Sequence, residues 1–313
     1  MPVTPAPPAT PTRQARHARA AVAALFLTNG AVFFNVVPRY PQIKADLAVG
    51  NAVFGTAIAA FPAGALLAGL LAGAVIRRLG SARTAAFGIV LTAAVTLAIP
   101  FVPNWAVFGG VLLAAGAVDA IVDVAQNAHG LRVQRLYRRS IVNSLHGLWS
   151  VGAVLGGLMG SAAAGLGLPL AAHLAISGAL FSVVALVAYR FLLPGPEDAE
   201  RLAEAQEAQD LAAADGHPAA PPARHPAGHT ASRTALLMLA ALGVLAACGA
   251  LAEDVGASWG ALYLSSLDAG AATAGLAVVA FQTAMTVGRL TGDRVVDRFG
   301  QRAVTRAGGL VTA

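Results

Sequence analysis

Two carboxylate side chains lie one helical turn apart inside an apolar stretch of this chain. Asp119 and Asp123 would share one side of a helix, and Gln126 with Asn127 extends that polar stripe. If the stretch crosses a membrane, an ionised carboxylate costs roughly 2.5–3.5 kcal/mol to place at the bilayer centre. Both side chains must then face the protein interior, water or a partner. A carboxyl group that binds and releases a proton as its access to water alternates would couple protons to transport.

Asp123 allows a second interpretation, because Arg132 follows it in an arginine-rich stretch. An ion pair between Asp123 and Arg132 would be a structural latch, and the residues leave latch and transport role open. Asp119 lies nearer the middle of the stretch, where the transport role is favoured. Glu253, beside Asp254 in a later apolar stretch, is a further candidate for proton coupling.

The next apolar stretch carries polar groups on one face. Asn143, His146 and Ser150 follow the i, i+3, i+7 spacing of a helix. These groups could hydrogen-bond a polar solute, and Trp149 offers a surface on which it could stack. The alternative is hydrogen bonding between helices, which polar residues commonly supply in membrane bundles. That alternative is favoured for Asn143 and stays open for His146.

Two asparagines of the first apolar stretch are expected to line the same cavity. Asn29 and Asn35 lie within two helical turns of each other. The candidates for solute binding that the residues indicate are therefore Asn29, Asn35, Gln126, Asn127, Asn143, His146 and Trp149.

The composition predicts an all-α polytopic membrane protein. Hydrophobic residues make up 57% of the 313 residues and charged residues 12%, whereas soluble domains carry about 25% charged residues. Mean hydropathy is +0.68. The net charge of +6 comes from arginines placed between apolar runs, which argues against nucleic acid as a partner. A single cysteine, Cys248, offers no disulfide or metal framework, and no metal or cofactor is expected.

Apolar runs of roughly 20 residues, the length of a membrane-spanning helix, recur along the chain. We expect spans at residues 20–37, 52–76, 84–101, 105–130, 141–165, 169–192, 234–255 and 269–290, and a further run beginning near Ala303. The predicted organisation is a disordered cytoplasmic tail (1–19), an N-terminal six-helix half (20–193), a cytoplasmic linker (194–232) and a partial C-terminal half (233–313), with two spans and the start of a third.

Arginines fall in alternate gaps between the predicted spans. The predicted outer loops hold only Arg39 and Lys44, while the tail and the other loops hold nearly all the remaining basic residues. This asymmetry is the positive-inside pattern. It predicts a multi-pass protein of the plasma (inner) membrane with a cytoplasmic N-terminus.

An internal repeat is indicated when the chain is aligned with itself so that Gly80 matches Gly300. In this register RRLG (77–80) aligns with DRFG (297–300). Gly55 then aligns with Gly275, and Phe61 with Phe281. A parallel repeat of two six-helix halves joined by a central loop is the organisation of one large class of transporters.

These motifs resemble the major facilitator superfamily, and in particular its fucose-permease-like sugar-transporter branch. The superfamily signature after the second span is Gly, three residues, Asp-Arg, one residue, Gly and then basic residues. GRLTGDRVVDRFG (288–300) fits it well, whereas the first copy has Arg77 where the aspartate belongs. The resemblance implies a cytoplasmic gate formed by Arg77, Arg78, Gly80, Asp293, Arg294, Asp297 and Arg298.

The branch resemblance rests on three further runs. DVAQNA (123–128), NSLHGLWSVG (143–152) and AEDVGASWGALYL (252–264) are similar to the branch, the last with Asp254 and Ser258 as departures. The resemblance adds Trp259 to the solute-binding candidates. Family members have twelve spans, so we expect this chain to be a fragment, or the product of a truncated reading frame, of a longer transporter.

The resemblance and the polar groups together imply a monomeric secondary active transporter that works by alternating access. A small polar solute, such as a sugar or a related metabolite, and protons are its expected partners, together with membrane lipids. An enzyme is not expected, because no set of nucleophile, base and orienting group is visible. Two alternatives stay open: proton-coupled export of drugs or metabolites, and a membrane sensor or scaffold that docks through residues 194–232.

Overall fold

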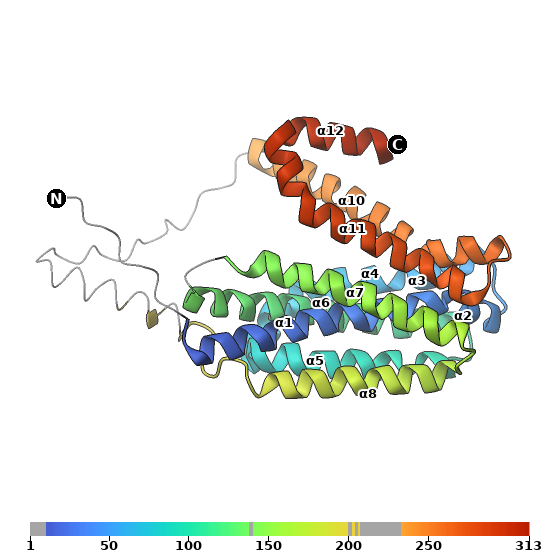
Figure 1. Cartoon of the computed structure of the whole chain (residues 1–313), viewed down its shortest axis with the longest axis horizontal. Helices are drawn as coiled ribbons and strands as arrows, with labels where there is room; N and C mark the ends of the chain where they lie inside the picture. Colours follow the sequence, from blue (N-terminus) through green and yellow to red (C-terminus); the bar gives the residue numbers. More distant parts are fainter. Residues whose placement is uncertain (1–10, 138–139, 200–201, 204–205, 207–232, 313) are drawn as a thin grey trace, which may run out of the picture. The chain divides into compact units, whose positions relative to one another are not determined.

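Helices form every regular element in the part of the chain that the computed structural model describes, which is residues 11–137, 140–199, 202–203, 206 and 233–312 (Figure 1). Seven helical segments of this part are long and apolar enough to cross a membrane, which confirms the predicted all-α polytopic fold class. The helices are α1 (Arg13–Phe34), α2 (Tyr40–Asp46), α3 (Asn51–Ile58), α4 (Ala60–Leu79), α5 (Ser81–Thr96), α6 (Trp105–Tyr137), α7 (Val142–Gly165), α8 (Leu170–Tyr189), α10 (Arg233–Ser266), α11 (Ala271–Phe299) and α12 (Gln301–Thr312).

The first helix begins earlier than its apolar run. Thr12 caps α1 by accepting a hydrogen bond from the backbone N–H of Ala15 at 3.2 Å, and the helix runs from Arg13. The prediction of a disordered tail is therefore wrong for residues 13–19, because a threonine cap and helix-compatible arginines extend the helix past the apolar segment. Residues 1–10 of the predicted tail lie outside the described residues.

Proline interrupts the second predicted span. A helix break at Ala59 separates α3 from α4, shortly before Pro62. Pro62 has no backbone N–H to donate to the carbonyl of Ile58, and its ring crowds that carbonyl. The segment from Asn51 to Leu79 nevertheless has the length and apolarity of one membrane span.

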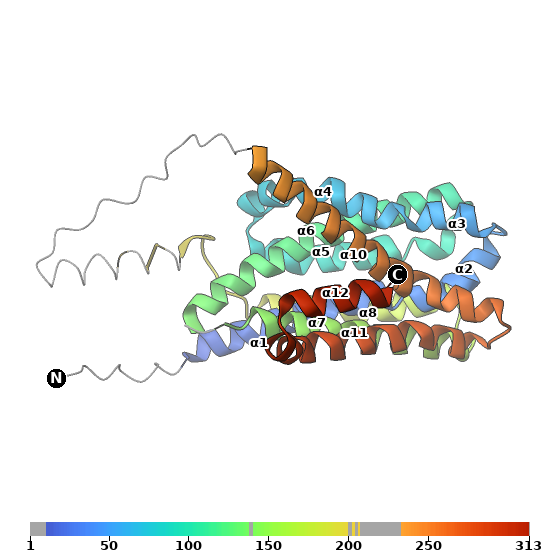
Figure 2. The same ribbon diagram turned by 90° about the horizontal axis from the view of Figure 1, so that it is seen from above.

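The helices pack through unusually close backbone contacts. Helix α1 packs along α7, and α4 packs along α6; α5 lies between α6 and α8 (Figures 1 and 2). A Cβ atom added at Gly152 on α7 would collide with the carbonyl of Leu27 on α1. Gly64 on α4 has the same relationship to the carbonyl of Leu113 on α6. Small residues at these crossings let the membrane helices approach closely.

The chain forms two compact units. The first comprises Met1–Glu197 with Ala257–Ala313, and the second comprises Asp198–Gly256. All of α1–α8, α11 and α12 belong to the first unit, as does the final part of α10; the second contains the beginning of α10. The predicted linker, residues 194–232, lies mainly outside the described residues. The domain boundaries inferred from the sequence therefore stay predictions.

Two segments of the chain have matching backbone features when they are aligned in the predicted register, in which Gly80 matches Gly300. The starts of helices coincide in this register: α3 begins at Asn51 and α11 at Ala271, while α5 begins at Ser81 and α12 at Gln301. The positive φ angles coincide too, at 81° for Gly80 and 80° for Gly300. Ala48 and Asp268, which both have positive φ angles (52° and 59°), are equivalent in the same register. These matches confirm the repeat.

Candidate functional site

A hydrogen-bonded network centred on Asn29 joins α1, α6 and α7. The amide nitrogen of Asn29 donates to Asp119 Oδ1 at 2.7 Å. Its amide oxygen accepts hydrogen bonds from Trp149 Nε1 at 2.9 Å and from Gln126 Nε2 at 3.3 Å. One buried asparagine thus contacts a carboxylate on α6 and an indole ring on α7.

The network continues along α6 to a histidine on α7. Gln126 Nε2 also approaches Asp123 Oδ1 at 3.3 Å. Asn127 Nδ2 donates to the carbonyl of Asp123 at 2.9 Å and to its Oδ1 at 3.2 Å. The oxygen of Asn127 lies 3.1 Å from His146 Nε2. Because an amide oxygen can only accept, His146 carries a proton on Nε2 in this arrangement.

Helical spacing explains why these side chains meet. Asp119, Asp123, Gln126 and Asn127 occupy positions i, i+4, i+7 and i+8, which form one stripe on α6. The glycine contacts that bring α7 against α1 set Trp149 within reach of Asn29. We name this set of seven side chains the Asn29 network: Asn29, Asp119, Asp123, Gln126, Asn127, His146 and Trp149.

Solvent access varies along the Asn29 network. Asn29 and Gln126 are buried, the two carboxylates and Trp149 are partly buried, and His146 is exposed. Gln126 Oε1 has no hydrogen-bond partner among the described residues. A buried amide oxygen without a partner is costly, so the network holds one acceptor available to a ligand or to water.

Three of the predicted solute-binding residues lie outside the network: Asn35, Asn143 and, on α10, Trp259. Asn143 is exposed, and no hydrogen bond within the described residues joins its side chain to the network. Asn35 bonds instead to α8, where its amide nitrogen donates to Ser177 Oγ at 2.8 Å and its oxygen lies 2.9 Å from His173 Nε2. The expectation that Asn29 and Asn35 line one cavity is therefore corrected: positions six residues apart point about 120° away from each other around a helix.

The two candidates on α10 belong to different units. Glu253 is partly buried in the second unit. Trp259 lies in the first unit, where its ring packs against Gly55 of α3, so that a Cβ atom added at Gly55 would be 3.0 Å from Trp259 Cζ2. Proton coupling by Glu253 and solute binding by Trp259 therefore stay predictions.

The possible latch between Asp123 and Arg132 is not formed. Helix α6 continues to Tyr137 instead of ending near Gly130, and a separation of nine residues puts Asp123 and Arg132 about 180° apart on it. Arg132 pairs with Glu197 instead, at 3.6 Å, and its Nη2 donates to the carbonyl of Pro194 at 3.0 Å. Asp123 therefore keeps its bonds to the Asn29 network.

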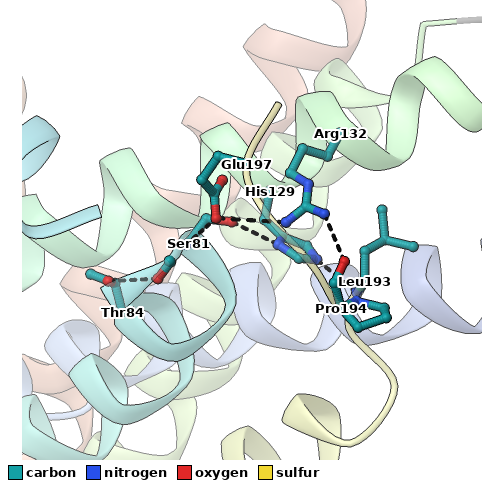
Figure 3. Close-up of polar contacts among 8 residues, drawn as sticks. Ser81, Thr84, His129, Arg132, Leu193, Pro194 and Glu197 are labelled. Carbon is teal, nitrogen blue, oxygen red and sulfur yellow. Dashed lines mark hydrogen bonds and ion pairs between the residues drawn. The ribbon is translucent and has the colours of Figure 1, made fainter. Parts of the chain in front are cut away.

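A second polar cluster surrounds Arg132, between the start of α5, the C-terminal part of α6 and the segment that follows α8 (Figure 3). Glu197 Oε1 accepts a hydrogen bond from the backbone N–H of Ser81 at 2.6 Å, at the first turn of α5. His129 is fully buried and lies 2.8 Å from Ser81 Oγ through Nδ1. The N–H of Leu193 donates to His129 Nε2 at 3.0 Å. Nε2 is therefore unprotonated, and Nδ1 donates to Ser81.

The cluster around Arg132 was not predicted from the sequence. Helix α6 places His129 and Arg132 three residues apart, but Glu197 reaches Arg132 and the N–H of Ser81 only through the tertiary fold. The signal available in the sequence was a histidine and an arginine near the end of an apolar run. Gln282 on α11 was also missed: it is fully buried, and both of its amide atoms are without a partner among the described residues.

The predicted gate is only partly described. Arg77 and Arg78 are exposed at the end of α4, and Gly80 turns the chain into α5 with its positive φ. Arg298 is exposed, with its guanidinium 5.6 Å from the ring centre of Phe299. The side chains of Asp293, Arg294 and Asp297 lie outside the described residues. Among the residues that the structure describes, no group of three or more His, Cys, Asp or Glu side chains could hold a metal ion.

Comparison with known proteins gives one family model and several relatives. The model described as Major Facilitator Superfamily matches residues 22–313. The uncharacterized transporter y4wD of Sinorhizobium fredii is 26% identical, over 92% of this chain and 70% of its own length. An uncharacterized MFS-type transporter of Yersinia pestis is 29% identical, with coverages of 88% and 65%. The membrane protein MosC of Rhizobium meliloti is 28% identical, with coverages of 92% and 64%. The chain thus spans about two thirds of the length of these relatives.

Proposed function

The chain belongs to the major facilitator superfamily, and we propose that it moves a small polar solute across the membrane together with protons. The family consists of membrane transporters rather than enzymes, and two of the relatives are named as transporters. The proposed mechanism is alternating access between two halves. The internal repeat supports it, because parallel repeats with a central solute site are the design of such transporters.

The contact between Asn29 and Asp119 carries the proposal. A carboxylate inside a membrane span is expensive and commonly functional, and Asn29 stabilises its charged form with a hydrogen bond of 2.7 Å. Hydrogen bonds to an ionised group are roughly twice as strong as neutral ones. Protonation of Asp119 would therefore weaken the hold of Asn29 on α6.

A weaker hydrogen bond between Asn29 and Asp119 would also affect the contact of Asn29 with α7. The amide oxygen of Asn29 accepts the indole N–H of Trp149 at 2.9 Å, so rotation of the amide group alters one bond to α6 and one to α7 together. In our proposal, the proton on Asp119 and the position of Trp149 are coupled through this single side chain. Asp123 and Glu253 are proposed as further proton-binding groups.

The proposed solute contacts are the polar groups of the Asn29 network. Gln126 Oε1 is a buried acceptor without a partner among the described residues, and a solute hydroxyl group would satisfy it. His146 is exposed, and Trp149, three residues further along α7, is a partly buried indole; an imidazole and an indole on one helix would suit a ring-shaped solute with hydroxyl groups. This pattern supports a sugar or a related metabolite as the cargo. Gln282, with its unpaired amide, is the proposed contribution of α11.

Uptake by the full-length protein in proteoliposomes tests the proposal. An inward proton gradient should drive uptake from a panel of neutral sugars and related metabolites. Asp119→Asn should abolish the response to the gradient, and Asp268→Asn, at an exposed position outside the network, should keep it. The proposal fails if no solute in the panel moves under the gradient, or if Asp119→Asn transports like the unmodified protein.

Export of an amphiphilic compound is a second candidate function. Aromatic rings extend from the network: Trp149 lies edge-on to Phe34 at 5.9 Å, and Phe33 lies 5.3 Å from Phe34 and 4.3 Å from Phe61. Rings of this kind would bind a partly apolar cargo. Proton-driven accumulation of a hydrophobic dye in inside-out vesicles, without uptake of sugars in proteoliposomes, would select export.

The arginine distribution supports an inner-membrane protein with its N-terminus in the cytoplasm. The proposed cytoplasmic ends then include Arg16 on α1 and the gate residues Arg77 and Arg78 on α4. A cysteine introduced at Arg16, in a protein with Cys248 replaced by alanine, should react with a membrane-impermeant maleimide only in inside-out vesicles. Labelling of intact spheroplasts would reverse the proposed orientation.

A further inference from the structure

A basic cavity lies where α1 begins and α8 ends. Its volume is about 980 Å³, and its lining includes Arg13 of α1, Arg83 of α5, Arg190 after α8, and the pair Arg132 and Glu197. Four arginines and one glutamate therefore share one cavity. This excess of positive charge attracts anions to the cavity, either from solvent or as part of a ligand.

The arginines of the cavity differ in their ion pairs and hydrogen bonds within the protein. Arg132 is bound to Glu197 at 3.6 Å and to the carbonyl of Pro194 at 3.0 Å, so it forms part of the wall (Figure 3). Arg13, Arg83 and Arg190 are exposed, and no ion pair within the described residues engages them. Their guanidinium groups are the cations that a ligand can reach.

An apolar groove adjoins the cavity along α1 and α8. It has a volume of about 490 Å³ and is lined by alanines of α1, including Ala20 and Ala24, and by valines of α8, including Val187. His17 and Phe191 line both the groove and the cavity. Their rings meet edge-on with centres 5.9 Å apart, so the basic cavity passes directly into the apolar groove.

We propose that this composite site binds an anionic phospholipid, with the phosphate among the exposed arginines and one acyl chain in the groove. The guanidinium group binds phosphate oxygens through paired hydrogen bonds. Basic pockets beside apolar helix surfaces at one membrane face are typical sites for anionic headgroups. A soluble anion would leave the groove empty, and a neutral lipid would leave the arginines unbalanced.

The charge arm of the test compares lipid headgroups. The full chain, purified in detergent, is titrated with phosphatidylglycerol and with phosphatidylcholine of the same acyl chains, and binding is read by native mass spectrometry. Phosphatidylglycerol should bind at least tenfold more tightly. The double variant Arg83→Gln/Arg190→Gln should lose this preference, since each arginine near a headgroup contributes about fivefold. Arg16→Gln, at an exposed position on α1 outside the cavity lining, should keep it.

The groove arm separates a lipid from a soluble anion. Val187→Trp should fill the groove and weaken phosphatidylglycerol several-fold, whereas Leu186→Trp, on the same helix but outside the groove lining, should not. Inorganic phosphate should compete poorly with the lipid and should be indifferent to Val187→Trp.

Three outcomes would overturn the proposal: equal binding of the two lipids, an unchanged preference in the double arginine variant, or displacement of the lipid by millimolar inorganic phosphate. Circular dichroism and size-exclusion profiles identify a variant that does not fold. If the double variant does not fold, the single variants Arg190→Gln and Arg190→Lys are compared with the unmodified protein. The same preference for phosphatidylglycerol over phosphatidylcholine in all three would also contradict the proposal.

Discussion

Asn29 on α1 and Asp119 on α6 are joined by a hydrogen bond of 2.7 Å, although they lie far apart in the chain. Asn29 meets three groups with one amide, because its oxygen also accepts from Trp149 and Gln126. A residue with these partners supports both the fold and the proposed proton coupling. The two roles can be separated by substitution.

Replacing Asn29 by alanine should affect stability and transport together. Asp119 would lose its donor, and leaving a buried or partly buried polar group unsatisfied costs roughly 1–3 kcal/mol. Thermal unfolding in detergent should therefore shift to lower temperature, and gradient-driven uptake should fall at least tenfold. Asp268→Asn, at an exposed position outside the network, should change neither quantity. Unchanged unfolding of Asn29→Ala would mean that the hydrogen bond to Asp119 contributes nothing to the fold.

The crossing of α1 and α7 predicts a sharp difference between two glycines. Gly152→Ala would drive a methyl group into the carbonyl of Leu27 and should destabilise the bundle by about 1–3 kcal/mol, as overpacking does. Gly69→Ala on α4 meets nothing within 4 Å and should be neutral or stabilising by up to about 1 kcal/mol, because alanine favours the helix. Urea or thermal unfolding of the two variants in the same detergent measures both. Equal stabilities would show that α1 and α7 do not pack this closely.

Local patterns in the sequence were sufficient to predict the helices and the stripe on α6. Length and apolarity mark a membrane span without any tertiary information, and the four polar residues from Asp119 to Asn127 share a helix face by spacing alone. The internal repeat was also readable, because glycines with positive φ, such as Gly80, recur where the backbone demands them.

Contacts between helices could not be read in the same way. The partner of Arg132 is Glu197, which lies far along the chain and outside every apolar run; no local spacing indicates it. The pairing of Asn35 with His173 and Ser177 depends on how α8 packs against α1. Helical periodicity alone does show that Asn29 and Asn35 face different directions. The expectation that they line one cavity was therefore avoidable from the sequence.

The cluster around Arg132 predicts unequal effects from its two charges. Arg132→Met should destabilise the protein more than Glu197→Gln, because Arg132 is nearly buried and also donates to Pro194, whereas Glu197 is partly exposed. Glu197→Gln can still accept from the N–H of Ser81. We expect thermal unfolding to fall clearly for the first variant and little for the second. The reverse order would show that the carboxylate at the start of α5 matters more than the guanidinium group.

The repeat predicts parallel effects of substitutions at equivalent positions of its two copies. Gly80→Ala and Gly300→Ala should both destabilise, since the backbone region of Gly80 (φ 81°, ψ 151°) is essentially confined to glycine and holding another residue there costs about 1–3 kcal/mol. Ala48→Gly should instead stabilise by up to about 1 kcal/mol, because alanine is held there at a φ of 52°. Asp268→Gly should gain less, since aspartate tolerates this region better than alanine does. Thermal unfolding of the four variants checks the pattern. Opposite signs for Gly80→Ala and Gly300→Ala would show that the two turns are not equivalent, and that the repeat does not extend to their backbone.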